Sequence, residues 1–261
     1  MNLVIDIGNT QIFAGIFSKG KPLITFRKSS KNPFSSDEFG IFLSLIMKEK
    51  GINPSLIKYS AIASVVPSLT SSVEEGIKRF ISPSQIFILT SGLKTGINIR
   101  YKNPHEVGAD RIANCIGAKR VYGNGNYIII DIGTATTFDL LTSKNEYLGG
   151  LIIPGPHLAA SSLFSSTAKL PQIDISKPAK LSIDTTVSAI QNGIYYLNLF
   201  GIKAITDFLK KEFFPSQNVK VIGSGGGIGI FEGENLFDFV NQELVLYGLD
   251  SLIDMNKEEK L

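Results

Sequence analysis

The chain has 261 residues, of which 43% are hydrophobic and 19% are charged, so it carries ample apolar material for a packed core. This balance excludes a disordered chain. The net charge is only +3 and the lysines are scattered, which argues against nucleic acid as the main partner.

Each half of the chain begins with a predicted β-meander. In the first half, short apolar runs are separated by Gly8-Asn9 and by a Lys-Gly-Lys turn, and the second half repeats this plan. The predicted strands cover residues 2–6, 11–17, 23–27, 127–131, 136–142 and 147–152.

Helices and further strands are expected after each meander. Ser36-Asp37-Glu38 offers capping and dipole chemistry for a helix whose apolar residues recur at three- and four-residue spacing. Either Asp184 or Thr185 would cap a long apolar helix in the second half. The other predicted elements are strands at 59–65, 85–89 and 219–222 and a helix at 68–80.

The order of these elements predicts an α/β fold of two lobes. In both halves the strands come first and alternate with helices afterwards, which is typical of mixed sheets flanked by helices. The polar Gly/Asn cluster at residues 122–126 marks the boundary between the halves. We therefore expect an N-terminal lobe at 1–122 and a C-terminal lobe at 123–261.

One short sequence occurs twice. Asp-Ile-Gly ends the first predicted strand of each half, so that Asp6 and Asp131 lie 131 − 6 = 125 positions apart. A phenylalanine follows each aspartate at the same offset, at Phe13 and Phe138. This repeat suggests two related lobes with a nucleotide bound between them.

The chemistry of the repeated turn suits phosphate. A carboxylate at a strand end can hold a hydrated divalent cation, and Gly8 permits close approach of the backbone. Asn9 and Thr10 supply short donors for phosphate oxygens, and the turn after Asp131 contains more hydroxyls. A single copy would be an ordinary β-turn, but two matched copies favour phosphate-binding turns.

A glycine run, 223–227, follows a predicted strand. It lacks the lysine and hydroxyl of a Walker A loop, and it lacks the acidic residue of a dinucleotide fingerprint. By itself it is read as a flexible turn. Beside two phosphate turns, it would let an adenine or a ribose approach the backbone.

Asp110 and Arg111 stand where a helix is expected to begin. One interpretation is structural, because an acidic residue is favoured at a helix N-terminus. The functional interpretation makes Asp110 the acceptor of a hydroxyl proton, while Arg111 steadies the substrate or the transferring phosphoryl group.

Other chemistry is disfavoured. The lone Cys115 has apolar neighbours typical of a structural thiol, and it allows no intramolecular disulfide, so a reducing compartment is expected. His105 and His157 lack partners at zinc-ligand spacing, and no serine lies in a Gly-x-Ser-x-Gly elbow. No signal peptide or membrane-spanning run is evident, so we expect a soluble, cytoplasmic protein.

These motifs together resemble the type III pantothenate kinases, which belong to the superfamily of actin, the sugar kinases and the Hsp70 chaperones. The resemblance runs almost from end to end. It rests on the turns after Asp6 and Asp131 and on the segments Asn103-Pro104, 108–111, 149–155, 186–189 and 223–227. The chain departs from the family pattern at Thr185, where asparagine is common, and at Ser224, where threonine is usual.

The resemblance implies two duplicated ribonuclease H-like, actin-like ATPase lobes with the nucleotide in the cleft. It implies ATP-dependent phosphorylation of pantothenate to 4'-phosphopantothenate, the first step of coenzyme A biosynthesis, in a homodimer with its active site near the subunit interface. Asp110 would be the catalytic proton acceptor, Asp131 would hold a monovalent cation (K⁺ or NH₄⁺), and Asp6 would hold Mg²⁺ directly or through water. The ATP contacts would come from Asp6, Ile7, Gly8, Asn9, Thr10, Gln11, Ile12, Phe13 and Thr134. The pantothenate contacts would come from Tyr101, Gly108, Ala109, Asp110, Arg111 and Thr186.

Two alternatives remain open at this point. Another small-molecule kinase of the same superfamily would share both phosphate turns and take a different acceptor. A nucleotide-binding scaffold or regulator would keep the turns without needing the Asp110-Arg111 pair.

Overall fold

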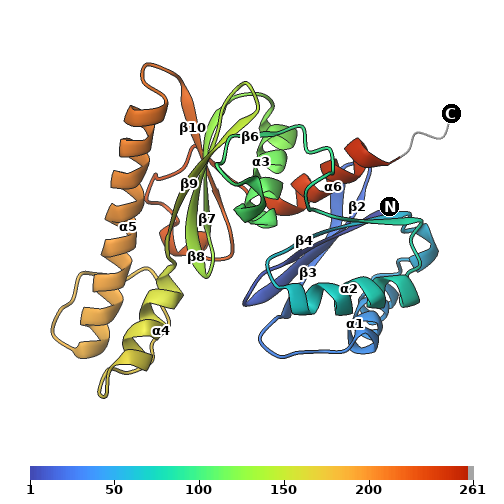
Figure 1. Cartoon of the computed structure of the whole chain (residues 1–261). Helices are drawn as coiled ribbons and strands as arrows, with labels where there is room; N and C mark the ends of the chain where they lie inside the picture. Colours follow the sequence, from blue (N-terminus) through green and yellow to red (C-terminus); the bar gives the residue numbers. More distant parts are fainter. Residues whose placement is uncertain (258–261) are drawn as a thin grey trace. The chain divides into compact units, whose positions relative to one another are not determined.

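The computed structural model describes residues 1–257 of the chain, which form two compact units (Figure 1). Unit 1 comprises Met1–Gly123 together with the segment that begins at Leu244, and unit 2 comprises Asn124–Glu243. The boundary between the halves thus lies one residue from the predicted one. The expected division at 123–261 differs in one respect, because the C-terminal helix returns to unit 1.

Unit 1 is built on a five-stranded mixed sheet with the order β3-β2-β1-β4-β5. The first three strands form an antiparallel meander, whereas β4 and β5 continue parallel to β1. The strands are β1 (Asn2–Ile7), β2 (Gln11–Ser18), β3 (Lys21–Ser29), β4 (Tyr59–Ser64) and β5 (Gln85–Ile88). The other elements of this unit are α1 (Ser36–Glu49), η1 (Pro54–Leu56), α2 (Pro67–Phe80), β6 (Asn98–Ile99), η2 (Pro104–Glu106), α3 (Ala109–Tyr122) and α6 (Leu244–Asn256).

Helices cover both faces of this sheet. Side chains alternate along each strand, so neighbouring residues of β1 contact different helices. On one face, Leu3, Ile5 and Ile7 are fully buried in a core shared with α1 and α2. On the other face, Asn2 donates a hydrogen bond of 2.7 Å to the Asp250 carboxylate of α6. Burial of each large apolar side chain, such as Leu3 or Ile5, stabilises the unit by about 1.5–3 kcal/mol.

Helix α6 joins unit 1 through unusually close contact with α3. A Cβ atom on Gly248 would collide with the carbonyl oxygen of Ala113, and one on Gly117 would collide with that of Leu244. The two glycines therefore let the two helix backbones touch. This contact explains why the C-terminal helix packs in the unit of the first half rather than with the strands that precede it.

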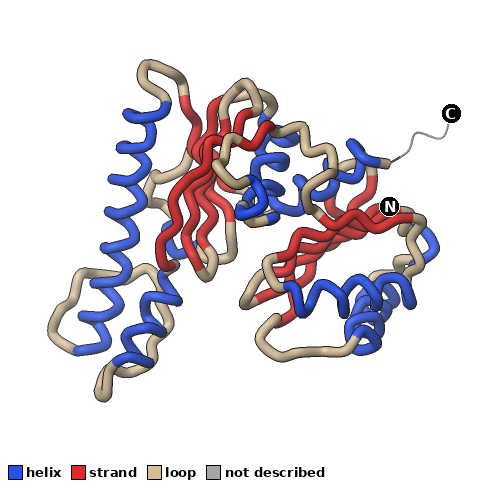
Figure 2. The backbone as a smooth tube through the Cα atoms, viewed as in Figure 1, coloured by secondary structure: helices blue, strands red, loops and turns tan. Residues whose placement is uncertain are grey.

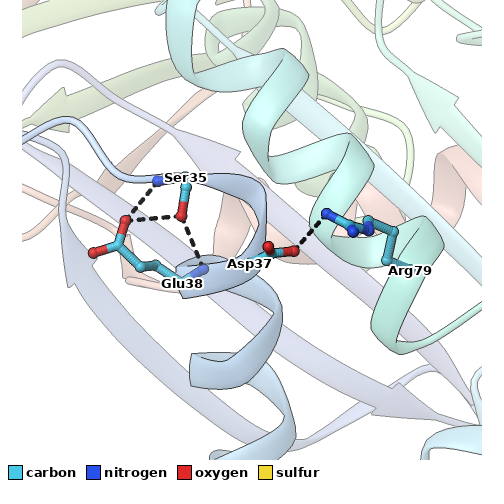
Figure 3. Close-up of polar contacts among 4 residues, drawn as sticks. All are labelled: Ser35, Asp37, Glu38 and Arg79. Atoms are coloured by element: carbon cyan, nitrogen blue, oxygen red, sulfur yellow. Dashed lines mark hydrogen bonds and ion pairs between the residues drawn. The ribbon is translucent and has the colours of Figure 1, made fainter.

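The start of α1 illustrates how local sequence sets an element boundary (Figure 3). Ser35, one residue before the expected Ser36, is the N-cap: its Oγ accepts a 3.2 Å hydrogen bond from the Glu38 N–H, and its own N–H donates one of 2.7 Å to the Glu38 carboxylate. This reciprocal pair is a capping box. Asp37 also pairs with Arg79 of α2, at an exposed position where such pairs contribute little.

Unit 2 repeats the plan of unit 1 (Figure 2). Its strands follow the order β9-β8-β7-β10-β11, which corresponds strand for strand to β3-β2-β1-β4-β5 and confirms the predicted duplication. Antiparallel pairing again gives way to parallel pairing after the central strand. The elements are β7 (Asn126–Ile132), β8 (Ala135–Leu141), β9 (Glu146–Pro154), α4 (Pro156–Ser166), α5 (Thr186–Phe213), β10 (Val219–Ser224), η3 (Ile228–Phe231) and β11 (Phe239–Val240).

The long helix α5 covers one face of the unit 2 sheet. Ile128, Ile130 and Phe138 from β7 and β8 share a buried core with Tyr195 and Leu199 of α5. None of the described helices is long and apolar enough to cross a membrane.

The two copies of the repeat differ in register. Asp6 lies directly opposite Phe13, whereas Asp131 lies opposite Thr137, and Phe138 pairs with Ile130 instead. The cause is the turn, which contains residues 8–10 in the first copy and only 133–134 in the second. The two phenylalanines at equal sequence offset are therefore not equivalent: the second points into the core, away from the aspartate.

Candidate active site

The first predicted turn links β1 to β2. Asp6 is half-buried near the end of β1, Asn9 and Thr10 are exposed, and the Gly8 N–H donates a 3.1 Å hydrogen bond to the carbonyl of Gln11. The turn therefore presents an acidic side chain and short polar groups at one edge of the unit 1 sheet. Their oxygen atoms match the ligands that Mg²⁺ takes beside substrate phosphates.

Not every predicted ATP contact can come from a side chain. Ile7 and Ile12 are buried in the core below the turn. Phe13 is also buried, and its ring is covered by the Arg27 guanidinium, 3.8 Å from the ring centroid. Ile7, Ile12 and Phe13 could therefore contact a nucleotide only through their backbone groups.

Asp110 occupies the first turn of α3, two residues after the N-cap Gly108. Its Oδ1 accepts a 2.9 Å hydrogen bond from the backbone N–H of Arg111. Burial raises the pKa of the Asp110 carboxyl above its usual value, while this hydrogen bond and the Arg111 charge oppose the rise. A raised pKa makes the carboxylate a stronger base, which suits a proton acceptor.

The start of α3 lies at the same sheet edge as the Asp6 turn. Ile7 and Ser64 are paired in neighbouring parallel strands, and the Val65 N–H donates a 3.0 Å hydrogen bond to the Ile7 carbonyl. Val65 Cγ1 would lie 3.7 Å from a Cβ atom on Gly108. Unit 1 thus gathers the Asp6 turn, the end of β4 and the Asp110 helix terminus along one edge.

The remaining unit 1 positions precede α3. Tyr101 is half-buried in the segment after β6, and η2 separates it from Gly108, Ala109 and Arg111. Arg111 is buried, with 7% of its surface exposed. Its guanidinium therefore works in a partly desolvated setting, where hydrogen bonds to anions are strong.

In unit 2 the Asp131 turn is enclosed by glycines from two other segments. Gly225, at φ +88°, leaves room for the Asp131 carboxylate and the Ile132 backbone, and any Cβ there would collide with both. Gly155, just after β9, packs on the carbonyl oxygens of Gly133 and Thr134 and donates a 3.0 Å hydrogen bond to the latter.

Most glycines of the run 223–227 are needed for close packing. Gly225 and Gly227 serve packing, since both press on Ile132, and the Gly227 N–H donates a 2.8 Å hydrogen bond to its carbonyl. Gly223 packs on side chains that follow β10. Among the glycines of this run, only Gly226 has open space where a Cβ atom would stand.

Thr186 lies elsewhere in unit 2, exposed in the first turn of α5. The preceding Thr185 is the N-cap and forms a capping box with Ser188. Asparagine, common at this position in the resembled family, is also a favoured N-cap residue, so the threonine preserves the helix start. The contacts at this end of α5 are with α4, through Ile190 and Ala160.

Sequence reasoning missed one group of residues. Asp139 of β8 is fully buried, and its carboxylate accepts hydrogen bonds from the Tyr147 hydroxyl (2.8 Å) and the Thr137 hydroxyl (3.1 Å). The signal was an acidic residue among the apolar residues of the predicted strand 136–142, two positions after Thr137.

Comparison with known sequences decides the family. The family model described as type III pantothenate kinase matches residues 2–207, which include the Asp6, Asp110, Asp131 and Thr186 positions. The type III pantothenate kinase of Legionella pneumophila (strain Corby) is 40% identical over 256 residues, covering 98% of this chain and 99% of that protein. The chain belongs to the type III pantothenate kinase family.

Other relatives agree. The type III pantothenate kinase of Elusimicrobium minutum (strain Pei191) is 37% identical over 257 residues, covering 98% of this chain and 99% of that protein. Among solved structures, a ROK family glucokinase from Streptomyces griseus in complex with glucose and AMPPNP aligns with a TM-score of 0.52. At 14% identity over 96% of this chain and 98% of that one, this match speaks for the two-lobed actin-like fold alone.

In this type III pantothenate kinase, one segment of the candidate site lies beyond the residues that the family model matches. The matched range ends before β10, so the glycine run after it lies outside the family model. The run is nevertheless what encloses Asp131. Each unit therefore holds one acidic turn, and unit 1 adds the half-buried Asp110 carboxylate in the first turn of α3.

Proposed function

We propose that this type III pantothenate kinase transfers the γ-phosphoryl group of Mg-ATP to the primary hydroxyl of pantothenate with Asp110 as the proton acceptor. The family performs the first step of coenzyme A biosynthesis. The observation that supports the role of Asp110 is its placement: a half-buried carboxylate, with its pKa raised by desolvation, at the sheet edge that carries the Asp6 turn.

The reaction is a single displacement at the γ-phosphorus. The pantothenate oxygen forms a bond to the γ-phosphorus, the bond from that phosphorus to the β,γ-bridging oxygen breaks, and the hydroxyl proton passes to Asp110. Arg111 neutralises charge on the substrate or on the transferring group, since its planar fork binds oxyanions in a bidentate manner. The protein acts mainly by positioning these groups.

The turn after β1 would hold the nucleotide phosphates. Asp6 would bind Mg²⁺ directly or through water, and Asn9, Thr10 and backbone N–H groups would contact phosphate oxygens. Bound Mg²⁺ supplies charge neutralisation of the phosphates. Tyr101, Gly108, Ala109 and Thr186 would contact pantothenate.

Asp131 would hold a monovalent cation, K⁺ or NH₄⁺, with Thr134 contacting ATP. The residues present fit such a group, because the Asp131 carboxylate lies in a turn that Gly225 and Gly155 enclose and that offers further oxygen atoms. A weakly hydrated monovalent cation would neutralise part of the phosphate charge at this turn.

A homodimer would form through an exposed apolar stripe on α5. Leu197, Phe200, Ala204 and Phe208 lie on one side of the helix, and the exposed fractions of the two phenylalanines are 61% and 57%. Gly201, between them, has open space beside it, which allows close approach of a second helix. A second copy of this chain is the favoured occupant, because one helix face can pair with itself about a two-fold axis.

The same helix connects this stripe to the site. Thr186 begins α5, and Leu197 follows 11 positions later, about 16 Å along the axis at 1.5 Å per residue. A dimer contact at the α5 stripe would thus place the subunit interface near a predicted pantothenate contact. The cytoplasmic location expected from the single cysteine stays a prediction.

A coupled assay of ADP release, run with and without pantothenate, tests the proposed function. A pantothenate kinase releases ADP only when the acceptor is present, in K⁺-containing buffer with Mg-ATP. ADP release that pantothenate does not stimulate, but a sugar or another hydroxy acid does, would indicate a different small-molecule kinase. Nucleotide binding without any stimulated turnover would indicate a scaffold.

A further inference from the structure

Three residues of unit 1 form a row across the strands beside the first acidic turn. Asp6 of β1 lies directly opposite Phe13 of β2, and Phe13 lies directly opposite Arg27 of β3. Directly paired residues of antiparallel strands project from the same face of a sheet. The three side chains therefore share one face, and the spacing of strands places the Cα atoms of Asp6 and Arg27 roughly 10 Å apart.

The end of β3 is attached to the turn itself. The Ser30 N–H, one residue after β3, donates a 3.0 Å hydrogen bond to the Thr10 carbonyl. Gln11, which begins β2, lies opposite Ser29 at the end of β3. Arg27 therefore lies at the same end of the sheet as the turn that would hold the ATP phosphates.

The Arg27 side chain folds back over β2. Its Cζ atom lies 3.8 Å from the centroid of the Phe13 ring, so the guanidinium covers that ring instead of extending away from the edge strand. Arg27 is exposed, whereas Phe13 is buried. A cation–π contact of this kind leaves most of the five N–H donors of a guanidinium for other acceptors.

Arg27 has no anionic partner within the protein. Among residues 1–257, its guanidinium forms neither an ion pair nor a hydrogen bond. An exposed cation that is held in place in this way can accept an anion from solution. The triphosphate of ATP is the anion expected at this turn, and the planar fork of arginine binds phosphate oxygens in a bidentate manner.

We propose that Arg27 is a further phosphate-binding residue of the ATP site, held beside the β1–β2 turn by the ring of Phe13. The inference rests on the proposed phosphate role of that turn. It adds a cation from β3, a strand outside the repeated motif. It also gives the buried Phe13 ring a role, which is to support the guanidinium.

The structural interpretation is that Arg27 only shields the Phe13 ring from water. Lys28 allows a comparison within the same strand, because its Nζ lies 4.8 Å from the ring centroid of Phe34 and 5.4 Å from that of Phe42. As the next residue along β3, Lys28 projects from the opposite face of the sheet. Shielding alone predicts that substitution of either cation changes stability and leaves the affinity for ATP unchanged.

The experiment titrates the full-length protein with Mg-ATP in the absence of pantothenate and follows the thermal midpoint, which needs no turnover. Arg27→Met keeps an unbranched apolar stem over Phe13. We expect it to weaken Mg-ATP binding about tenfold or more, as for the loss of a hydrogen bond to a charged group. Arg27→Lys keeps the charge without the fork and should weaken binding about three- to tenfold.

Lys28→Met is the matched control, since it removes the same charge from the other face, and it should leave Mg-ATP binding unchanged. The ring is tested by Phe13→Leu, which should weaken binding about two- to fivefold in the wild-type background and should add little to Arg27→Met, because residues that act together are not additive.

The outcomes separate the two proposals. A wild-type protein whose thermal midpoint does not respond to Mg-ATP would refute the proposed function, and this inference with it. A wild-type response that Arg27→Met leaves unchanged would overturn this inference alone, and so would an equal loss in Lys28→Met, which would indicate an effect of net charge. Full additivity of Phe13→Leu and Arg27→Met would overturn the supporting role of the ring.

Discussion

At the start of α3, the Asp110 carboxylate lies where a side chain at position 108 would stand. A Cβ atom built on Gly108 would collide with Oδ1 of Asp110, the oxygen that accepts the Arg111 N–H. Gly108 has an ordinary negative φ of −57°, which any residue can adopt. Glycine is needed here because a larger residue would collide with the Asp110 carboxylate, not because the backbone is unusual. The carboxylate folds back over its own helix N-cap and is thereby held at the sheet edge.

Gly108→Ala should therefore damage turnover more than stability. The added methyl group displaces the Asp110 carboxylate, and even a small misplacement of a reacting group costs rate. We expect kcat to fall by about tenfold or more, with the thermal midpoint changed only slightly. Gly229→Ala, at a glycine with open space around it, is the matched control and should keep full activity.

Asp110→Asn should abolish most turnover. Loss of a general base costs about 10²–10⁴-fold in kcat, while ATP still binds and shifts the thermal midpoint as it does for the wild type. The nearby exposed Glu106→Gln serves as the control. Turnover of Asp110→Asn close to the wild-type rate would remove Asp110 from the mechanism.

The raised pKa of Asp110 also predicts a pH dependence of stability. The folded state binds this proton more tightly than the unfolded chain, so the buried charge destabilises the protein at neutral pH. The penalty begins to shrink as pH falls through the raised, folded-state pKa, and it is gone below the ordinary pKa of the unfolded chain. Asp110→Asn should hence unfold at a higher temperature than the wild type at pH 7, with the gap closing in acid; the opposite order would contradict the desolvation argument.

Two adjacent glycines should respond differently to alanine. Gly225→Ala strains a residue at φ +88° and pushes on Asp131 and Ile132, so both stability and the K⁺ response should be lost. Gly226→Ala meets open space and should fold normally. If a nucleotide approaches the open side of Gly226, the added methyl group should raise the KM for ATP; an unchanged KM would argue that no nucleotide approaches there.

A substitution at the α3–α6 contact should lower the stability of unit 1 without changing the candidate active site. Gly248→Ala drives a methyl group into the Ala113 carbonyl and should destabilise unit 1 by about 1–3 kcal/mol, measured by denaturant unfolding. The effect on the KM values of the protein that remains folded should be small. A stability equal to that of the wild type would mean that the two helices separate easily.

The α5 stripe predicts the oligomeric state. Phe200→Lys places a charge in the centre of the stripe and should convert a dimer into a monomer in sedimentation experiments, with loss of activity if the site needs its partner. Leu45→Lys makes a similar change on exposed α1 and should remain dimeric. A wild-type monomer that is fully active would refute the dimer.

Much of the fold follows from local sequence. The Asp-Ile-Gly repeat, the alternating strands and the cap at Thr185 each depend on neighbours along the chain, and the sheet order confirms the duplication that they predict. The family match confirms what the motifs implied together. Local patterns suffice here because hydrophobic period and turn chemistry act over a few residues.

Two features of the fold needed tertiary structure. The register difference between Asp6–Phe13 and Asp131–Thr137 depends on one residue of turn length, which equal sequence spacing conceals. The return of α6 to unit 1 depends on glycines 131 positions apart, Gly117 and Gly248, meeting backbone to backbone.

The roles of single residues divide in the same way. By itself the sequence determined that this chain has two acidic turns and one unrepeated Asp110-Arg111 pair, because those are local patterns of residue type. Only the tertiary structure decided that Gly108 makes room for Asp110, that most of the glycine run serves packing, and that Asp139 reaches Thr137. Steric exclusion and buried hydrogen bonds act between atoms that the chain brings together only when it folds.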